Sequence, residues 1–199
     1  MKTLNNFIII VFCVTLFHAC NSIQTTQSAT ETEASTTEYI DSLALQLQYL
    51  DSITNCGSLI HMDIYEIGDL KSIGVSVHSV DVEDTSFQYV NFRKDCGSKY
   101  YYSWENARLM LGECQYLLSA IDTIKANIER VTEHEERYAY VTKDNIRLFA
   151  SNKGGKNWNI SFSVDYNKDN ATISLTTSEL EKLVILVKDS ISKLEEIKK

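Results

Sequence analysis

The chain has 199 residues, of which 44% are hydrophobic and 23% are charged, and its formal net charge is −8. This composition supports one good hydrophobic core or two small ones, so it excludes a chain that is disordered throughout. The acidic balance argues against binding to a phosphate backbone, because that affinity comes mainly from Lys and Arg.

The N-terminus has the pattern of an export sequence. Lys2 precedes an apolar run over residues 7–17, which is long enough for a signal peptide and too short to span a bilayer comfortably. The run ends at His18, Ala19 and Cys20. A small residue directly before Cys resembles the lipobox of bacterial envelope lipoproteins of the Bacteroidetes type. The resemblance implies a signal peptide over residues 1–19 and acylation of Cys20; an uncleaved membrane anchor and a plain signal peptide are the alternatives.

Residues 20–37 are mostly small and polar, so they predict a flexible tether behind the lipid anchor. The residue after Cys20 is Asn21 and not Asp, which by resemblance to lipoprotein sorting rules favours the outer membrane. No acidic cluster follows Cys20 directly, so we expect an anchor that faces the periplasm, with the membrane contacted through the lipid.

A helix is predicted over residues 38–56. Ser35 to Glu38 has the form of a capping box, in which a hydroxyl and a carboxylate satisfy free backbone amides. One apolar stripe recurs at helical spacing and predicts that this helix docks on the rest of the chain; its members are Ile40, Leu43, Ala44, Leu47 and Leu50.

The rest of the chain contains two copies of one pattern of apolar and polar positions. Residues 134–199 align with residues 61–126 without a gap at a constant offset of 73 (134 − 61 = 73). Apolar positions coincide throughout the alignment, as at Ile73 and Ile146. This predicts a duplicated unit with a pseudo-twofold axis, the first copy over residues 57–133 and the second over residues 134–199.

Each copy shows four alternating segments followed by a helix, which predicts an α+β fold of two antiparallel four-stranded sheets, each with its helix. The first copy has strands at residues 65–67, 73–77, 87–89 and 100–102 and a helix over 104–128; the second has strands at 138–140, 146–150, 160–164 and 173–175 and a helix capped by Thr176 to Glu179. This order of elements, together with residues 171–180, resembles the Whirly and single-stranded-DNA-binding coactivator folds. The resemblance implies binding to single-stranded nucleic acid, whereas export and the acidic balance argue against it.

Three of the five cysteines remain after Cys13 in the signal peptide and the lipidated Cys20 are set aside. Cys114 falls on the apolar stripe of its helix and is predicted to be buried. Cys56 and Cys96 both stand in Cys-Gly-Ser turns, and an oxidising compartment permits a disulfide between them.

The sequence contains no nucleophile motif, phosphate loop or nucleotide fingerprint, so it predicts neither catalysis nor a cofactor. His61 with Asp63, and His134 with Glu136, stand two residues apart on predicted strands. Two ligands per pair are too few for a metal site, so we interpret both pairs as solvated strand ends and predict no metal.

A contact surface is predicted on the outer sheet face of the first copy, opposite its helix. This face is expected to show Ile64, His78, Val90, Phe92 and Tyr101, and exposed apolar side chains of this kind mark interfaces; cover by other parts of the chain is the alternative. The outer face of the second copy is expected to be polar, with Arg137, Arg147, Phe149, Ser161, Ser163, Thr172 and Ser174.

The predicted function is therefore a non-enzymatic envelope lipoprotein that binds a protein or a glycan through the first outer face. Nucleic-acid binding is the alternative that the fold resemblance suggests, with the basic residues Lys143, Arg147, Lys153, Lys156 and Lys168. A hydrolase or metal-dependent enzyme is a further alternative. The sequence does not indicate an oligomeric state.

Overall fold

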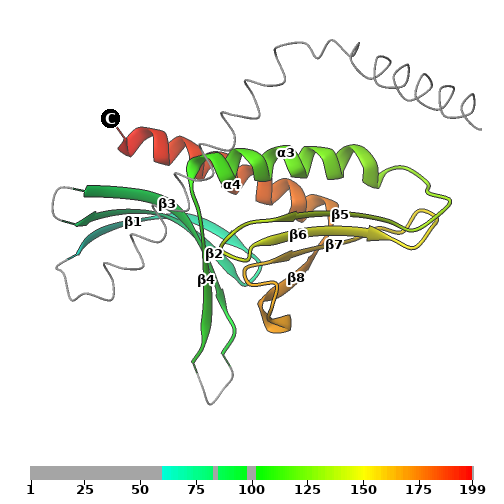
Figure 1. The fold of residues 1–199 in the computed structure, drawn as a ribbon, viewed down its shortest axis with the longest axis horizontal. Helices are drawn as coiled ribbons and strands as arrows, with labels where there is room; N and C mark the ends of the chain where they lie inside the picture. The colour runs from blue at the N-terminus through cyan, green and yellow to red at the C-terminus, as the bar shows by residue number, and fades with distance from the viewer. Residues whose placement is uncertain (1–59, 83–84, 98–101, 199) are drawn as a thin grey trace, which may run out of the picture. The chain divides into compact units, whose positions relative to one another are not determined.

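The computed structural model describes residues 60–82, 85–97 and 102–198. Two four-stranded antiparallel sheets, each followed by a helix, make up this part of the chain (Figure 1). The first repeat unit consists of β1 (His61–Leu70), β2 (Ile73–Val82), β3 (Thr85–Asp95), β4 (Trp104–Leu109) and α3 (Leu111–Ile128). The second consists of β5 (Glu136–Val141), β6 (Arg147–Asn152), β7 (Asn159–Ser163), the 3-10 turn η1 (Asp169–Ala171), β8 (Thr172–Leu175) and α4 (Thr177–Ile197). The α+β class and the two sheet-plus-helix units are thus confirmed.

Both sheets are meanders in which neighbouring strands in the sequence pair with one another. A β-bulge between Glu66 and Gly68 interrupts the β1–β2 ladder. Gly68 has a φ of 153°, and a Cβ there would stand 3.0 Å from Leu186 Cδ2 on α4. The bulge therefore needs glycine for both its backbone conformation and its close contact with the helix.

The two helices begin at equivalent capping positions with different chemistry. Thr176 caps α4, where its hydroxyl accepts from the backbone N–H of Glu179 and its own N–H donates to the Glu179 carboxylate at 2.7 Å, as the sequence predicted. At the start of α3, Met110 has no hydroxyl, and its N–H donates to Glu113 Oε2 at 3.2 Å. No helix among the described residues is long and apolar enough to cross a membrane.

One hydrophobic core joins the two repeat units. The helix of the second unit, α4, packs on β1, β2 and β3 of the first sheet, while α3 packs beside α4 (Figure 1). Between the sheets the rings of Phe92 and Phe162 lie 5.5 Å apart, and both side chains are fully buried. Each sheet therefore contacts both helices, and not only the helix that follows it in the sequence.

The ungapped alignment at an offset of 73 is wrong beyond β2. Val75 pairs with Phe92 in the first sheet, and Leu148 pairs with Phe162 in the second. Leu148 follows Val75 by 73 residues, but Phe162 follows Phe92 by only 70 (162 − 92 = 70). Ala107 and Ile173, which pair with these two phenylalanines, differ by 66 (173 − 107 = 66). The first unit therefore has three extra residues between β2 and β3 and four more between β3 and β4.

This shift also corrects the last strand and the helix of the first unit. Tyr102 is 90% exposed and lies in no strand, and the predicted start of the helix at Trp104 is instead the start of β4. Ala107 and Leu109 alternate with polar neighbours and are buried, as a strand requires. The helix begins seven residues later than predicted, at Leu111 (111 − 104 = 7).

The predicted signal peptide, tether and helix at residues 38–56 lie outside the described residues. Cys20, Cys56 and Tyr101 also lie there. They remain predictions.

Candidate functional site: the outer groove of the first sheet

The outer face of the first sheet, opposite the helices, carries different residues from those predicted. Val90 and Phe92 are fully buried in the core, so their predicted exposure is wrong. The cause is the odd shift of three residues, because moving a strand by an odd number exchanges its two faces. Tyr89 and Asn91 occupy the outer face of β3 instead, beside His78 and Ile64, which pair with each other across β2 and β1. Ile64 is 54% exposed.

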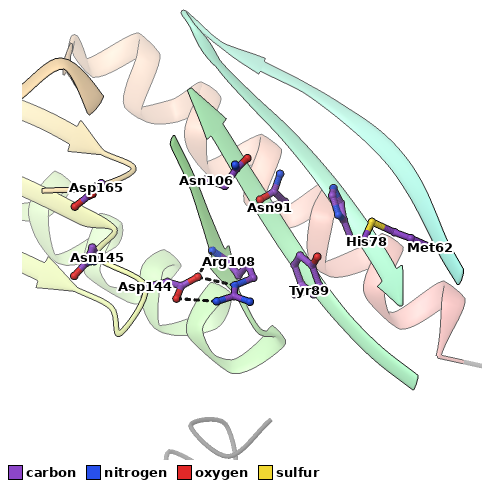
Figure 2. Close-up of a pocket in the computed structure, with 9 residues that line it drawn as sticks. All are labelled: Met62, His78, Tyr89, Asn91, Asn106, Arg108, Asp144, Asn145 and Asp165. Atoms are coloured by element: carbon purple, nitrogen blue, oxygen red, sulfur yellow. Dashed lines mark hydrogen bonds and ion pairs between the residues drawn. The ribbon is translucent and has the colours of Figure 1, made fainter. Parts of the chain in front are cut away.

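A polar pocket of about 480 Å³ lies between this face and two turns of the second unit (Figure 2). We call it the proximal pocket. The first sheet contributes Met62, His78, Tyr89, Asn91, Asn106 and Arg108, and the turns contribute Asp144, Asn145 and Asp165. Three of these side chains are carboxamides, which both donate and accept hydrogen bonds.

An ion pair fixes the wall that the second unit provides. Arg108 Nε donates to Asp144 Oδ2 at 2.8 Å and its terminal nitrogen donates to Oδ1 at 3.3 Å, while the Arg108 backbone N–H donates to Oδ2 at 2.9 Å (Figure 2). Both side chains are mostly buried, at 21% and 23% exposure. A bidentate pair that also satisfies an edge-strand amide holds the turn in one orientation.

The two turns of this wall are also tied together. Asn145 adopts a positive φ of 67°, a conformation that Asn tolerates better than most residues. Its carbonyl accepts from the Tyr166 backbone N–H at 3.0 Å. Farther along β4, Lys168 reaches across to Glu105 at 2.7 Å. The wall is therefore anchored to β4 at two points.

His78 lies on the floor of the groove and is neutral at pH 7, because burial lowers its pKa below the usual 6.5. Its Nε2 lies 2.9 Å from Ser76 Oγ, and its ring centroid is 5.2 Å from that of Tyr89. Burial raises the pKa of Tyr89, so this ring also stays neutral. The floor thus offers uncharged polar groups beside an aromatic ring.

A second pocket of about 490 Å³ continues the groove along the same face toward the β3–β4 connection. We call it the distal pocket. It shares His78, Asn91 and Asn106 with the proximal pocket and adds Ile64, Glu66, Ser72, Gly74, Ser76, Arg93, Asp95 and Trp104. Trp104 is 52% exposed, and the Arg93 guanidinium lies 4.6 Å from its ring centroid.

The two His-carboxylate pairs fall outside the groove lining. His61 Nε2 lies 3.8 Å from Asp63 Oδ1, so that pair shares a face as expected, while Glu136 pairs with Arg130 at 3.1 Å. Within residues 60–82, 85–97 and 102–198, no three His, Cys, Asp or Glu side chains come together as metal ligands would.

The thiols that the structure describes are Cys96 and Cys114. Cys114 is fully buried in the core, as predicted. The Cys96 thiol donates to the Asn170 carbonyl at 3.5 Å. Because Cys56 lies outside the described part of the chain, the disulfide between Cys56 and Cys96 stays a prediction.

Two of the basic residues of the nucleic-acid alternative, Lys168 and Arg147, contact other side chains of the chain. Lys168 is held by Glu105, which raises the pKa of its ammonium group. The Arg147 guanidinium lies over the rings of Phe149 and Tyr166, at 5.4 and 5.6 Å from their centroids. Its position on the outer face of β6 agrees with the sequence prediction.

Sequence reasoning missed most of the groove. Asn91, Asn106, Arg108 and Asp144 were not singled out, because their importance depends on strand register and on a contact between the two units. The alternation of Trp104, Asn106 and Arg108 with buried Ala107 and Leu109 is the one pattern that could have revealed the outer face of β4.

Comparisons of the chain with protein-family models, with curated proteins and with solved structures found no match.

Proposed function

We propose that the chain is a non-catalytic envelope lipoprotein that binds a carbohydrate in the outer groove of its first sheet. The observation that carries the proposal is the lining of the proximal pocket, which combines three carboxamides, Asn91, Asn106 and Asn145, with the neutral side chains of Tyr89 and His78. Sugar hydroxyls donate and accept hydrogen bonds, as carboxamides do; the carboxamide of Asn106 is exposed, while Tyr89 and Asn91 are 6% and 8% exposed.

Charge also favours a neutral ligand. Arg108 is already paired with Asp144, and Asp165 lies 3.7 Å from the Lys168 ammonium group. Among the described residues that line the proximal pocket, Arg108 is the one cation, and it already has a carboxylate beside it, so a phosphorylated or carboxylated ligand would find no free positive charge there. A neutral, hydroxyl-rich ligand needs no free cation, so these ion pairs do not weaken its binding.

Binding is tested on the purified chain carrying Cys20→Ser, which removes the acylation site. We expect saccharides from a panel of neutral mono- and oligosaccharides to bind in calorimetric titration, and Asn106→Leu to weaken binding at least about tenfold, because a lost polar partner costs about 1.4 kcal/mol or more. Ser174→Leu is the matched control, since Ser174 is exposed on the outer face of the second sheet. If no saccharide binds, the glycan proposal is refuted, and binding of a protein partner is the next hypothesis to test.

The lipid anchor is tested separately. In a bacterial host that processes lipoproteins, the wild-type chain should incorporate radiolabelled palmitate and fractionate with the outer membrane. Cys20→Ser should abolish the label. A labelled Cys20→Ser chain would contradict the proposed anchor.

A hydrolytic activity is the second candidate, because Ser76 Oγ and His78 Nε2 are 2.9 Å apart in the groove, as a nucleophile and its base are. Ser76 is 7% exposed. His78 Nδ1, which an acidic residue holds in a triad, has no hydrogen-bond partner among the described residues. Hydrolysis of a small activated ester, abolished by Ser76→Ala, would favour this candidate over simple binding.

We also propose that the two units keep a pseudo-twofold relation. The contact between Phe92 and Phe162 supports it, because these residues occupy equivalent places in the strand register. Superposition of the two units in a crystal structure tests the relation.

A further inference from the structure

The outer groove is longer than its proximal pocket, because the two pockets share a floor. His78, Asn91 and Asn106 line both of them. From Arg108 to Trp104 the groove follows β4 for about 13 Å, at ~3.3 Å per strand residue. An extended ligand can therefore contact both pockets at once.

The far end of the distal pocket has the features of a platform for a flat ring. Trp104 lies at the rim with 52% of the residue exposed, and the Arg93 guanidinium lies over one face of its ring at 4.6 Å from the centroid. Gly74 leaves the floor without a side chain, and a Cβ there would meet only Asp69 Oδ1 at 3.5 Å and the Arg93 carbonyl at 3.9 Å. A methyl group at Gly74 would therefore make only ordinary van der Waals contacts, and no positive φ restricts a side chain there.

The described lining of the distal pocket is slightly acidic, since it holds the two acids Glu66 and Asp95 and one base, Arg93. An anionic sugar would be repelled there, and a neutral one would not. The hydrogen-bonding groups along the shared floor remain uncharged.

We propose that the distal pocket is a second sugar subsite, so that the ligand is a neutral oligosaccharide of at least two rings. One ring lies in the proximal pocket, and the next packs its C–H face on Trp104 above Gly74. The inference rests on the proposed function and adds to it the length and charge of the ligand.

The test is a titration of the Cys20→Ser chain with mono-, di- and trisaccharides of glucose, in α1,4 and β1,4 linkage, and of N-acetylglucosamine in β1,4 linkage. In at least one series we expect the affinity to rise about tenfold or more from one ring to two. A tenfold rise corresponds to about 1.4 kcal/mol, which one packing contact with an aromatic ring can contribute. Gly74→Phe should fill the distal pocket and remove this gain, and Trp104→Ala should reduce it. Gly74→Ala is the control, since a methyl group there meets only ordinary contacts.

The possible outcomes are distinct. Equal affinity for one and two rings in every series overturns the second subsite and leaves the proposed function intact. The same holds if Gly74→Phe keeps the gain in affinity, provided that its melting temperature matches that of Gly74→Ala. Failure of every saccharide to bind overturns both.

Discussion

The carboxyl group of Glu113 should destabilise the fold at neutral pH. Glu113 lies at the start of α3 and is 8% exposed. Burial raises the pKa of its carboxyl group from 4.5 to about 7, even though the Met110 N–H donates a hydrogen bond to this group. In the unfolded chain the group is ionised above pH 4.5. Between these two pKa values the folded protein binds a proton that the unfolded chain does not, so stability falls as pH rises.

The magnitude follows from the two pKa values. A tenfold difference in proton affinity is worth about 1.4 kcal/mol, so a pKa of about 7 in place of 4.5 corresponds to a loss of about 3 kcal/mol once pH exceeds 7. Glu113→Gln cannot ionise and keeps an oxygen for the Met110 N–H. We expect this variant to be more stable than the wild type by up to about 3 kcal/mol at pH 8, and the difference to shrink toward pH 4.5.

The assay is urea unfolding followed by circular dichroism at several pH values from 4.5 to 8. Glu179→Gln is the matched control, because Glu179 caps α4 at the equivalent position (179 − 66 = 113) but has a lowered pKa, first from the Thr176 N–H and then from Lys71. A group with a lowered pKa stabilises at neutral pH and loses that effect in acid, so this variant should be less stable at pH 7. Parallel stability curves for the wild type and Glu113→Gln would refute the reasoning.

Three further experiments test the fold. Phe92→Ala should lower the free energy of unfolding by about 3 to 5 kcal/mol, because the ring is fully buried; a change below about 1 kcal/mol in urea unfolding would restore the exposed position first predicted. A double-mutant cycle of Arg108→Ala and Asp144→Ala should give a coupling energy of about 1 to 3 kcal/mol, because the pair is bidentate and mostly buried; additive effects would contradict a fixed groove wall. Gly68→Ala should cost about 1 to 3 kcal/mol in thermal unfolding, from its φ of 153° and the contact with Leu186; an unchanged melting temperature would mean that the bulge relaxes freely.

The elements that sequence alone predicted well are those whose evidence is local. The helix that begins after Thr176 follows from its capping box and stripe, and the polar outer face of the second sheet follows from strict alternation. In β3 both faces carry large apolar or aromatic residues, with Tyr89 on one and Phe92 on the other. Alternation there fits either orientation, so only the pairing with β2 decides which face is inside.

The packing of α4 on the first sheet was beyond prediction for a different reason. An apolar stripe indicates that a helix is covered and does not indicate by what. The close approach of Leu186 to Gly68 and of Lys193 to the Tyr65 ring, at 4.4 Å, joins segments more than a hundred residues apart in the sequence. The groove wall has the same origin, since Arg108 and Asp144 belong to different units.

The residues that break the repeat are also the residues that lengthen the groove. β7 ends at Ser163, one residue after Phe162, whereas β3 continues to Asp95, three residues after the equivalent Phe92. β8 begins one residue before Ile173, whereas β4 begins with Trp104, three residues before the equivalent Ala107. The β3–β4 ladder therefore extends beyond its counterpart by two residue pairs, and this extension carries Asp95 and Trp104 of the distal pocket. A duplicated unit needs no such extension to close its core, since the second unit buries Phe162 without it. The proposed binding surface would use this extra length, so the substitutions that test the proposal lie at Trp104 and Gly74.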